Sequence, residues 1–122
     1  MLDHFKTKLE RIFEVLGPSV NKEDATKDLL LTLLANYLRL IAKNPKNQKI
    51  LSFLSQKEIT TPENFREAVE EAKEKFKDEP SSIDFDALFT QAQDETLKAY
   101  VEELKKSLPP EKIEQITSIV NS

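Results

Sequence analysis

The sequence predicts an all-α protein, on three observations. Glycine occurs once among 122 residues, at Gly17, whereas β-rich and loop-rich chains of this size normally place more glycine in turns. Leu, Glu and Lys, which are strong helix formers, dominate the composition. Apolar residues make up 39% of the chain and recur at helical spacing, which excludes a disordered chain. We expect a single helical domain over residues 1–122, a compact bundle of six or seven short-to-medium helices wrapped around a central, mostly apolar second helix.

The first helix is expected over residues 2–16. Its apolar residues follow one another at steps of three and four, with one adjacent pair, and so form one stripe on the helix. Gly17 suits the position just after a helix end, and Pro18 cannot continue the helix. The stripe consists of Leu2, Phe5, Leu9, Ile12, Phe13 and Leu16.

The second helix, residues 22–43, contains the most apolar stretch of the chain, residues 29–42. Asn21 or Ser19 is positioned to cap its start, and two acidic residues follow in the first turn. At 1.5 Å per residue the apolar stretch reaches only about 21 Å, which is shorter than the hydrocarbon layer of a bilayer. Arg39 inside the stretch adds a further penalty. We therefore expect no membrane insertion.

The polar residues of this second helix fall on one narrow edge. They follow steps of four, four, three and four and occupy an arc of about 80°. The rest of the helix surface is apolar, so we expect neighbouring helices on most sides of it. The polar arc consists of Asp28, Thr32, Asn36, Arg39 and Lys43.

Two shorter helices should follow. Asn44 can cap a helix that begins at Pro45 and runs to residue 55. The next helix runs to residue 77, and its start has two candidate caps. Thr60 forms a capping box with Glu63, whereas Thr61 before Pro62 forms a simpler cap.

The last two helices are expected after residue 84 and after residue 110. Asp84 can cap the first of them. Its apolar residues before and after residues 93–96 lie on faces rotated by about 120°, and Asp94 can cap a new start. We therefore predict a kink or break at residues 93–96. The pair Pro109-Pro110 separates this element from a final helix over residues 110–120.

No residue pattern predicts an enzyme, a cofactor site or a metal site. Without cysteine there is no thiolate ligand and no cysteine nucleophile. His4 is the only histidine; its neighbour Asp3 cannot face it on a helix, so we expect a surface residue. Asp84-Phe85-Asp86 lacks the further oxygen ligands and the glycine of a calcium loop. One glycine cannot build a phosphate-binding loop.

Two charged surfaces are candidate binding sites. Residues 1–58 carry 10 basic and 7 acidic residues, and residues 59–122 carry 8 and 15; such asymmetry can steer a partner. The acidic candidates Glu67, Glu70 and Glu74 form a ridge on the fourth helix. The basic candidates Lys43, Lys46 and Lys49 lie at the corner around Asn44-Pro45. This Lys43–Lys57 region also suits a nucleic-acid-binding helical domain, but it has little arginine and no set of aromatic residues for stacking.

We interpret the chain as a non-enzymatic protein–protein interaction module, a small adaptor, regulator or inhibitor-type protein. Rigid helical faces with uneven charge suit the recognition of another protein. The first alternative is a structural homodimer, formed if the second helix is not fully covered by its own chain. Nucleic-acid binding is the weaker alternative. The N-terminal residues lack the apolar segment of a secretion signal, so we expect a cytoplasmic protein.

Overall fold

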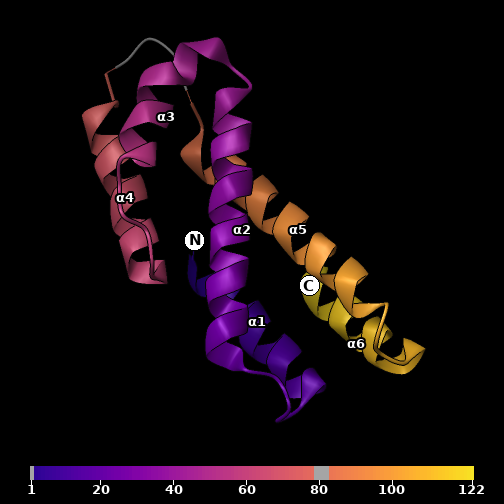
Figure 1. Cartoon of the computed structure of the whole chain (residues 1–122). Helices are drawn as coiled ribbons and strands as arrows, with labels where there is room; N and C mark the ends of the chain where they lie inside the picture. The colour runs from indigo at the N-terminus through magenta and orange to yellow at the C-terminus, as the bar shows by residue number, and fades with distance from the viewer. Residues whose placement is uncertain (1, 79–82) are drawn as a thin grey trace.

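A computed structural model describes residues 2–78 and 83–122 (Figure 1). Helices make up 78% of the described residues, which contain no strand, and this confirms the all-α prediction. A short 3₁₀ turn, η1, precedes α3. The elements are α1 (Leu2–Leu16), α2 (Lys22–Ala42), η1 (Pro45–Asn47), α3 (Gln48–Ser55), α4 (Pro62–Lys75), α5 (Phe85–Leu104) and α6 (Pro110–Val120).

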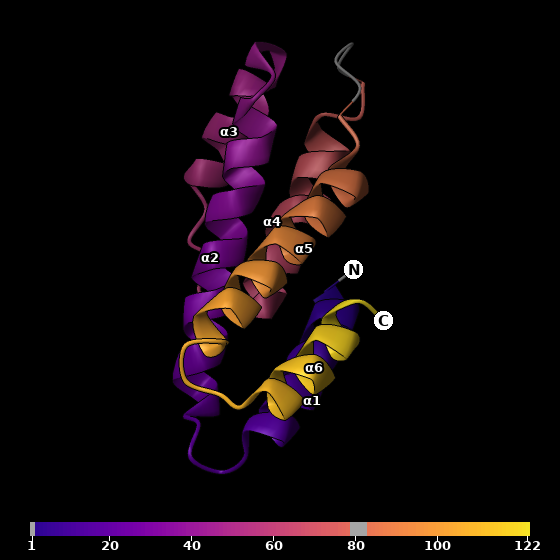
Figure 2. The same cartoon turned by 90° about the vertical axis from the view of Figure 1, so that its right-hand side faces the viewer.

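The helices are arranged in two groups that pack against each other. In Figure 2, α2 and α3 lie along one side of the molecule, and α4, α5, α1 and α6 lie on the other. The most extensive packing is between α2 and α5, and α6 packs against both α1 and α5. No helix among the described residues is long and apolar enough to cross a membrane.

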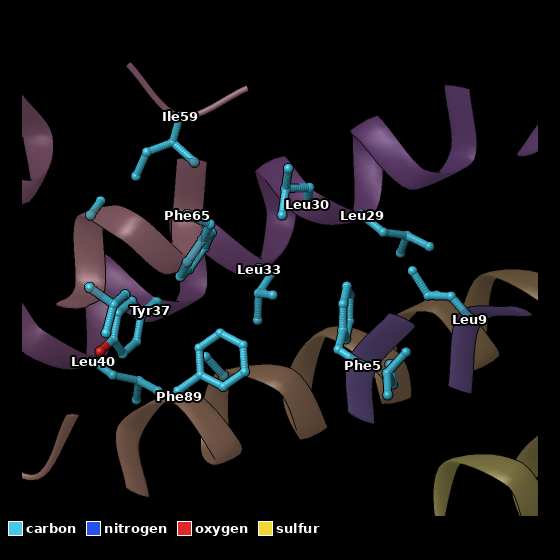
Figure 3. Close-up of a cluster of buried hydrophobic side chains, with 14 of the residues drawn as sticks. Phe5, Leu9, Leu29, Leu30, Leu33, Tyr37, Leu40, Ile59, Phe65 and Phe89 are labelled. Atoms are coloured by element: carbon cyan, nitrogen blue, oxygen red, sulfur yellow. The ribbon is translucent and has the colours of Figure 1, made fainter. Parts of the chain in front are cut away.

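The core is built on the inner face of α2. Tyr37 is fully buried, and its ring lies 5.8 Å from the rings of Phe65 on α4 and Phe89 on α5, measured between centroids. The Tyr37 hydroxyl donates a hydrogen bond of 3.2 Å to the Phe85 carbonyl. Figure 3 shows these side chains with others contributed by α1. The inner face consists of Leu29, Leu30, Leu33, Tyr37, Leu40 and Ile41.

The glycine and the capping residues that predict the helix ends lie at those ends in the structure. Gly17 has φ 88°, a left-handed conformation that glycine adopts without strain, and it ends α1. The side chains of Asn21 and Asn44 accept hydrogen bonds from backbone N–H groups at the starts of α2 and η1. Of the two candidates for α4, Thr61 is the cap, because its hydroxyl accepts from the Asn64 N–H at 3.1 Å. The Thr60 hydroxyl instead donates a hydrogen bond to the side-chain oxygen of Asn64.

Of the kink or break predicted at residues 93–96, the break does not form, because α5 is one helix from Phe85 to Leu104. Two of the polar residues there, Gln93 and Thr96, are buried inside the bundle rather than placed at a helix start. Thr96 is buried, donates to the Ala92 carbonyl at 2.7 Å and accepts from Asn36 of α2 at 2.9 Å. Asp94 pairs with Lys98 along the same helix. The helix α5 is continuous, and its two apolar faces pack against different neighbouring helices.

Candidate functional site

The side of α2 that faces away from the core is a second apolar surface. Leu31 is 57% exposed, and it is the only large apolar side chain so exposed in the described part of the chain. Ala35 and Ala42 are exposed, and Leu34 and Leu38 are half-buried. These five residues, called here the outer face of α2, follow helical steps of three, one, three and four. Such a stripe is typical of a helix that contacts a partner.

The outer face differs from the exposed edge expected from the sequence. The polar arc was expected to be the solvated side of the helix, but part of it faces α5. Asn36 donates to Thr96 at 2.9 Å, and the Arg39 guanidinium pairs with the Glu95 carboxylate. As a result the apolar outer face, and not only a polar edge, is exposed to solvent. The apolar surface of α2 is therefore wider than its neighbours cover.

The outer face carries opposite charges at its two ends. Asp24 and Asp28 lie in the N-terminal half of α2, and Arg39 and Lys43 lie at its C-terminal end; all four are exposed. Lys27 is the exception to this separation. Asp28 and Lys43 form no ion pair with another described residue, while Arg39 pairs with Glu95 at 51% side-chain exposure. The helix dipole is positive at the N-terminus and negative at the C-terminus, so these charges oppose it at both ends and stabilise the helix.

The predicted acidic ridge on α4 is exposed and solvated. Glu74 pairs at 2.8 Å with Lys77, which follows the end of α4. Glu70 lies 3.6 Å from Lys73, whose ammonium is closer to Asp86 of α5, at 2.8 Å. Exposed pairs of this kind contribute little to stability. Glu67 lines a shallow surface depression with its neighbours on α4, and no buried polar group converges on it.

The predicted basic residues lie at the corner between α2 and α3. Lys43, Lys46 and Lys49 are exposed, and none pairs with a carboxylate of a described residue. Only Lys49 lines the groove of about 370 Å³ between α3 and α4, which also includes Phe53. The structure thus keeps the three lysines at one end of the molecule without joining them in one groove.

The aromatic floor of this groove is already covered. The ammonium groups of Lys57 and Lys75 each lie 4.7 Å from the centroid of the Phe53 ring. The Phe76 ring meets the Phe53 ring edge-on at 5.7 Å between centroids. Cation–π contacts within the chain therefore occupy the ring faces that a stacked base would need.

The groups with shifted pKa values do not form a catalytic cluster. Burial raises the pKa of Tyr37, and the nearby Asp86 and Asp84 add to the shift. The hydrogen bond that the Lys73 ammonium donates to the Asp86 carboxylate raises the pKa of Lys73. At the surface, the backbone N–H at the start of α4 lowers the pKa of Glu63. In residues 2–78 and 83–122, no three His, Asp or Glu side chains are arranged to hold a metal ion.

Comparison with known proteins gives no match to a protein-family model, to a curated protein or to a solved structure.

Proposed function

We propose that this chain is a protein–protein interaction module that binds its partner through the outer face of α2. The exposed Leu31, at the N-terminal end of that apolar stripe, is the observation that carries the proposal. Full burial of a leucine side chain contributes about 1.5–3 kcal/mol, so covering this face supplies a driving force for association. Apolar patches on small domains commonly mark such sites.

The geometry favours a helical partner. Anchors at steps of three and four along one helix match the way an amphipathic helix packs against another protein. Ala35 and Ala42 leave room for the close approach of a partner helix, and the leucines beside them supply apolar area. A small adaptor, regulator or inhibitor-type protein needs only one such rigid face. The cysteine-free composition fits a reducing compartment, and the cytoplasm remains the expected one.

The test compares partner capture by the wild type and by two charge-matched variants. Leu31→Glu replaces the exposed leucine of the outer face with a carboxylate. Gln115→Glu adds the same charge at an exposed position on α6, on the other side of the molecule. We expect Leu31→Glu to lose a partner that the wild type and Gln115→Glu retain, with all three proteins equally folded by circular dichroism. Equal capture by all three proteins would reject the outer face as the binding site.

A second candidate is self-association through the same face, and the charge pattern favours it. In an antiparallel pair of α2 helices, the acidic N-terminal half of one copy meets the basic C-terminal end of the other. Turning the helix about a two-fold axis near Ala35 brings Asp28 of one copy to the level of Lys43 of the second copy. The surface is therefore self-complementary in charge as well as in apolar character.

Sedimentation velocity over a wide concentration range separates the two candidates. A mass that rises to twice that of the chain in the wild type, and stays single in Leu31→Glu, identifies the partner as a second copy. A single mass at all concentrations rejects the homodimer and leaves the binding of a different protein as the proposal.

A further inference from the structure

A pocket lies where α1, α5 and the end of α6 meet, away from the outer face of α2. Its volume is about 520 Å³, within the range of small-molecule sites, roughly 300–1,000 Å³. Its lining combines polar side chains with an apolar wall, and it includes His4, Lys8, Gln93, Asp94, Leu97 and Val120. The outer face of α2 contains none of these residues.

Lys8 supplies a buried positive charge to this pocket. The residue is only 8% exposed, and its ammonium donates one hydrogen bond, of 2.7 Å, to the Val120 carbonyl at the end of α6. An ammonium group has three N–H donors. The described residues offer it no carboxylate within ion-pair distance, although a buried charge is stable only when it is compensated. Two of its donors thus remain for a ligand or for water.

Gln93 supplies a buried amide without a partner. It lies on α5 and is 7% exposed, and its side chain forms no hydrogen bond with another described residue. No fully enclosed polar side-chain atom in this part of the chain lacks a partner, so the Gln93 amide reaches the pocket rather than a closed interior. Buried amides in native proteins are normally hydrogen-bonded. An occupant of the pocket would complete this one.

We propose that this pocket binds a small monocarboxylate with a short apolar chain. The carboxylate accepts hydrogen bonds from the Lys8 ammonium and the Gln93 amide, and the apolar chain lies against Leu97 and Val120. The pocket offers one buried cation, which matches a single negative charge. Asp94 also lines the pocket, and its pairing with Lys98 at 2.9 Å offsets part of its charge. The repulsion that remains disfavours a dianion such as phosphate more than a monocarboxylate.

The test is a titration of the ¹⁵N-labelled full chain with hexanoate, followed by NMR. We expect saturable shifts in the amide signals of residues 4–8, 90–97 and 118–122. Hexanamide, which has the same shape without the charge, should bind at least ~10-fold more weakly, a difference of about 1.4 kcal/mol. Shifts spread over the surface without saturation, or equal binding of hexanamide, would overturn the proposal.

Variants locate the contacts. Lys8→Met keeps the aliphatic stem and removes the charge, and Gln93→Leu removes the amide; each should weaken hexanoate binding at least ~10-fold. Lys6→Met, on an exposed neighbour in α1, is the matched control and should bind as the wild type does. If Lys8→Met fails to fold, Gln93→Leu and the hexanamide comparison decide the question. Unchanged affinity in Gln93→Leu contradicts the site.

Discussion

At the scale of single residues, Tyr37 joins three helices. Its ring lies between Phe65 and Phe89, and its hydroxyl reaches the backbone of Phe85 at the start of α5. Burial makes the hydroxyl hard to ionise, because the phenolate would lose its hydration next to Asp86. This one side chain thus contributes both to the packing of the core and to the sensitivity of the fold to high pH.

Tyr37 is expected to make the fold sensitive to high pH. Its pKa in the folded protein is raised above the usual 10.0, so above that pH the unfolded chain releases a proton that the folded chain retains. The free energy of unfolding then falls as pH rises, by up to about 1.4 kcal/mol per pH unit. Tyr37→Phe should lose part of this dependence in urea unfolding measured below and above pH 10.

Lys73 and Tyr100 also have raised pKa values, and they weaken the fold over the same alkaline range. The Tyr37→Phe variant therefore keeps a residual slope. An alkaline slope equal to that of the wild type would show that Tyr37 ionises as easily in the folded state as in the unfolded state.

Substitutions at Gly17 measure the cost of a left-handed backbone conformation without a change in packing. It has φ 88°, and a Cβ atom built there would meet no atom within 4 Å. Gly17→Ala should destabilise the fold by about 1 kcal/mol through the left-handed conformation alone. Gly17→Asn should cost less, because asparagine tolerates this region better. Urea unfolding measures both, and an alanine variant as stable as the wild type would show that the turn relaxes.

At the scale of helices, the ends are set by local chemistry and the contacts by the whole bundle. Proline, glycine and capping side chains mark the starts and stops of α1, α2, α4 and α6, and these are the boundaries that the sequence predicts best. The predicted break in α5 is wrong, because a capping residue, Asp94, is also an ordinary helix residue that pairs with Lys98. The hydrogen bond between Thr96 and Asn36 of α2 forms only in the assembled bundle, so the sequence alone does not reveal that the helix continues.

The two candidate caps of α4 give an element-scale prediction. Thr61→Ala removes the hydrogen bond to the Asn64 N–H and should cost about 1 kcal/mol. Thr60→Ala removes only an exposed side-chain contact and should change the free energy of unfolding by less than ~0.5 kcal/mol. Equal losses in the two variants would indicate that the capping box forms in solution.

At the scale of the whole molecule, the sequence predicts that α2 is central but not which of its faces stays uncovered. Leu31 and Leu33 are equally apolar, and only the assembled bundle buries one and exposes the other. The pocket beside Lys8 cannot be predicted from the sequence, because α1 is distant in the chain from α5 and α6. The acidic ridge and the basic corner could be predicted as charged surfaces, and no structural feature singles either out as a site.

The division of α2 into two faces predicts opposite responses to one kind of substitution. Leu33 is 0% exposed, so Leu33→Ala should cost about 2–5 kcal/mol through the cavity that it leaves. Leu31→Ala should change the free energy of unfolding by less than ~0.5 kcal/mol at a concentration where the chain is monomeric. A large loss for Leu31→Ala would place Leu31 in the core of the monomer.

The central claim is that the outer face of α2 is the surface at which this protein meets another chain. Its most direct test is photo-crosslinking in the source cells from an amino acid introduced at Ala35, compared with Glu67 on the acidic ridge and Lys46 at the basic corner. We predict an adduct of one defined mass from position 35, whether with a second copy or with another protein, and none from positions 67 and 46. Adducts from position 67 or 46 with none from position 35 would contradict the account.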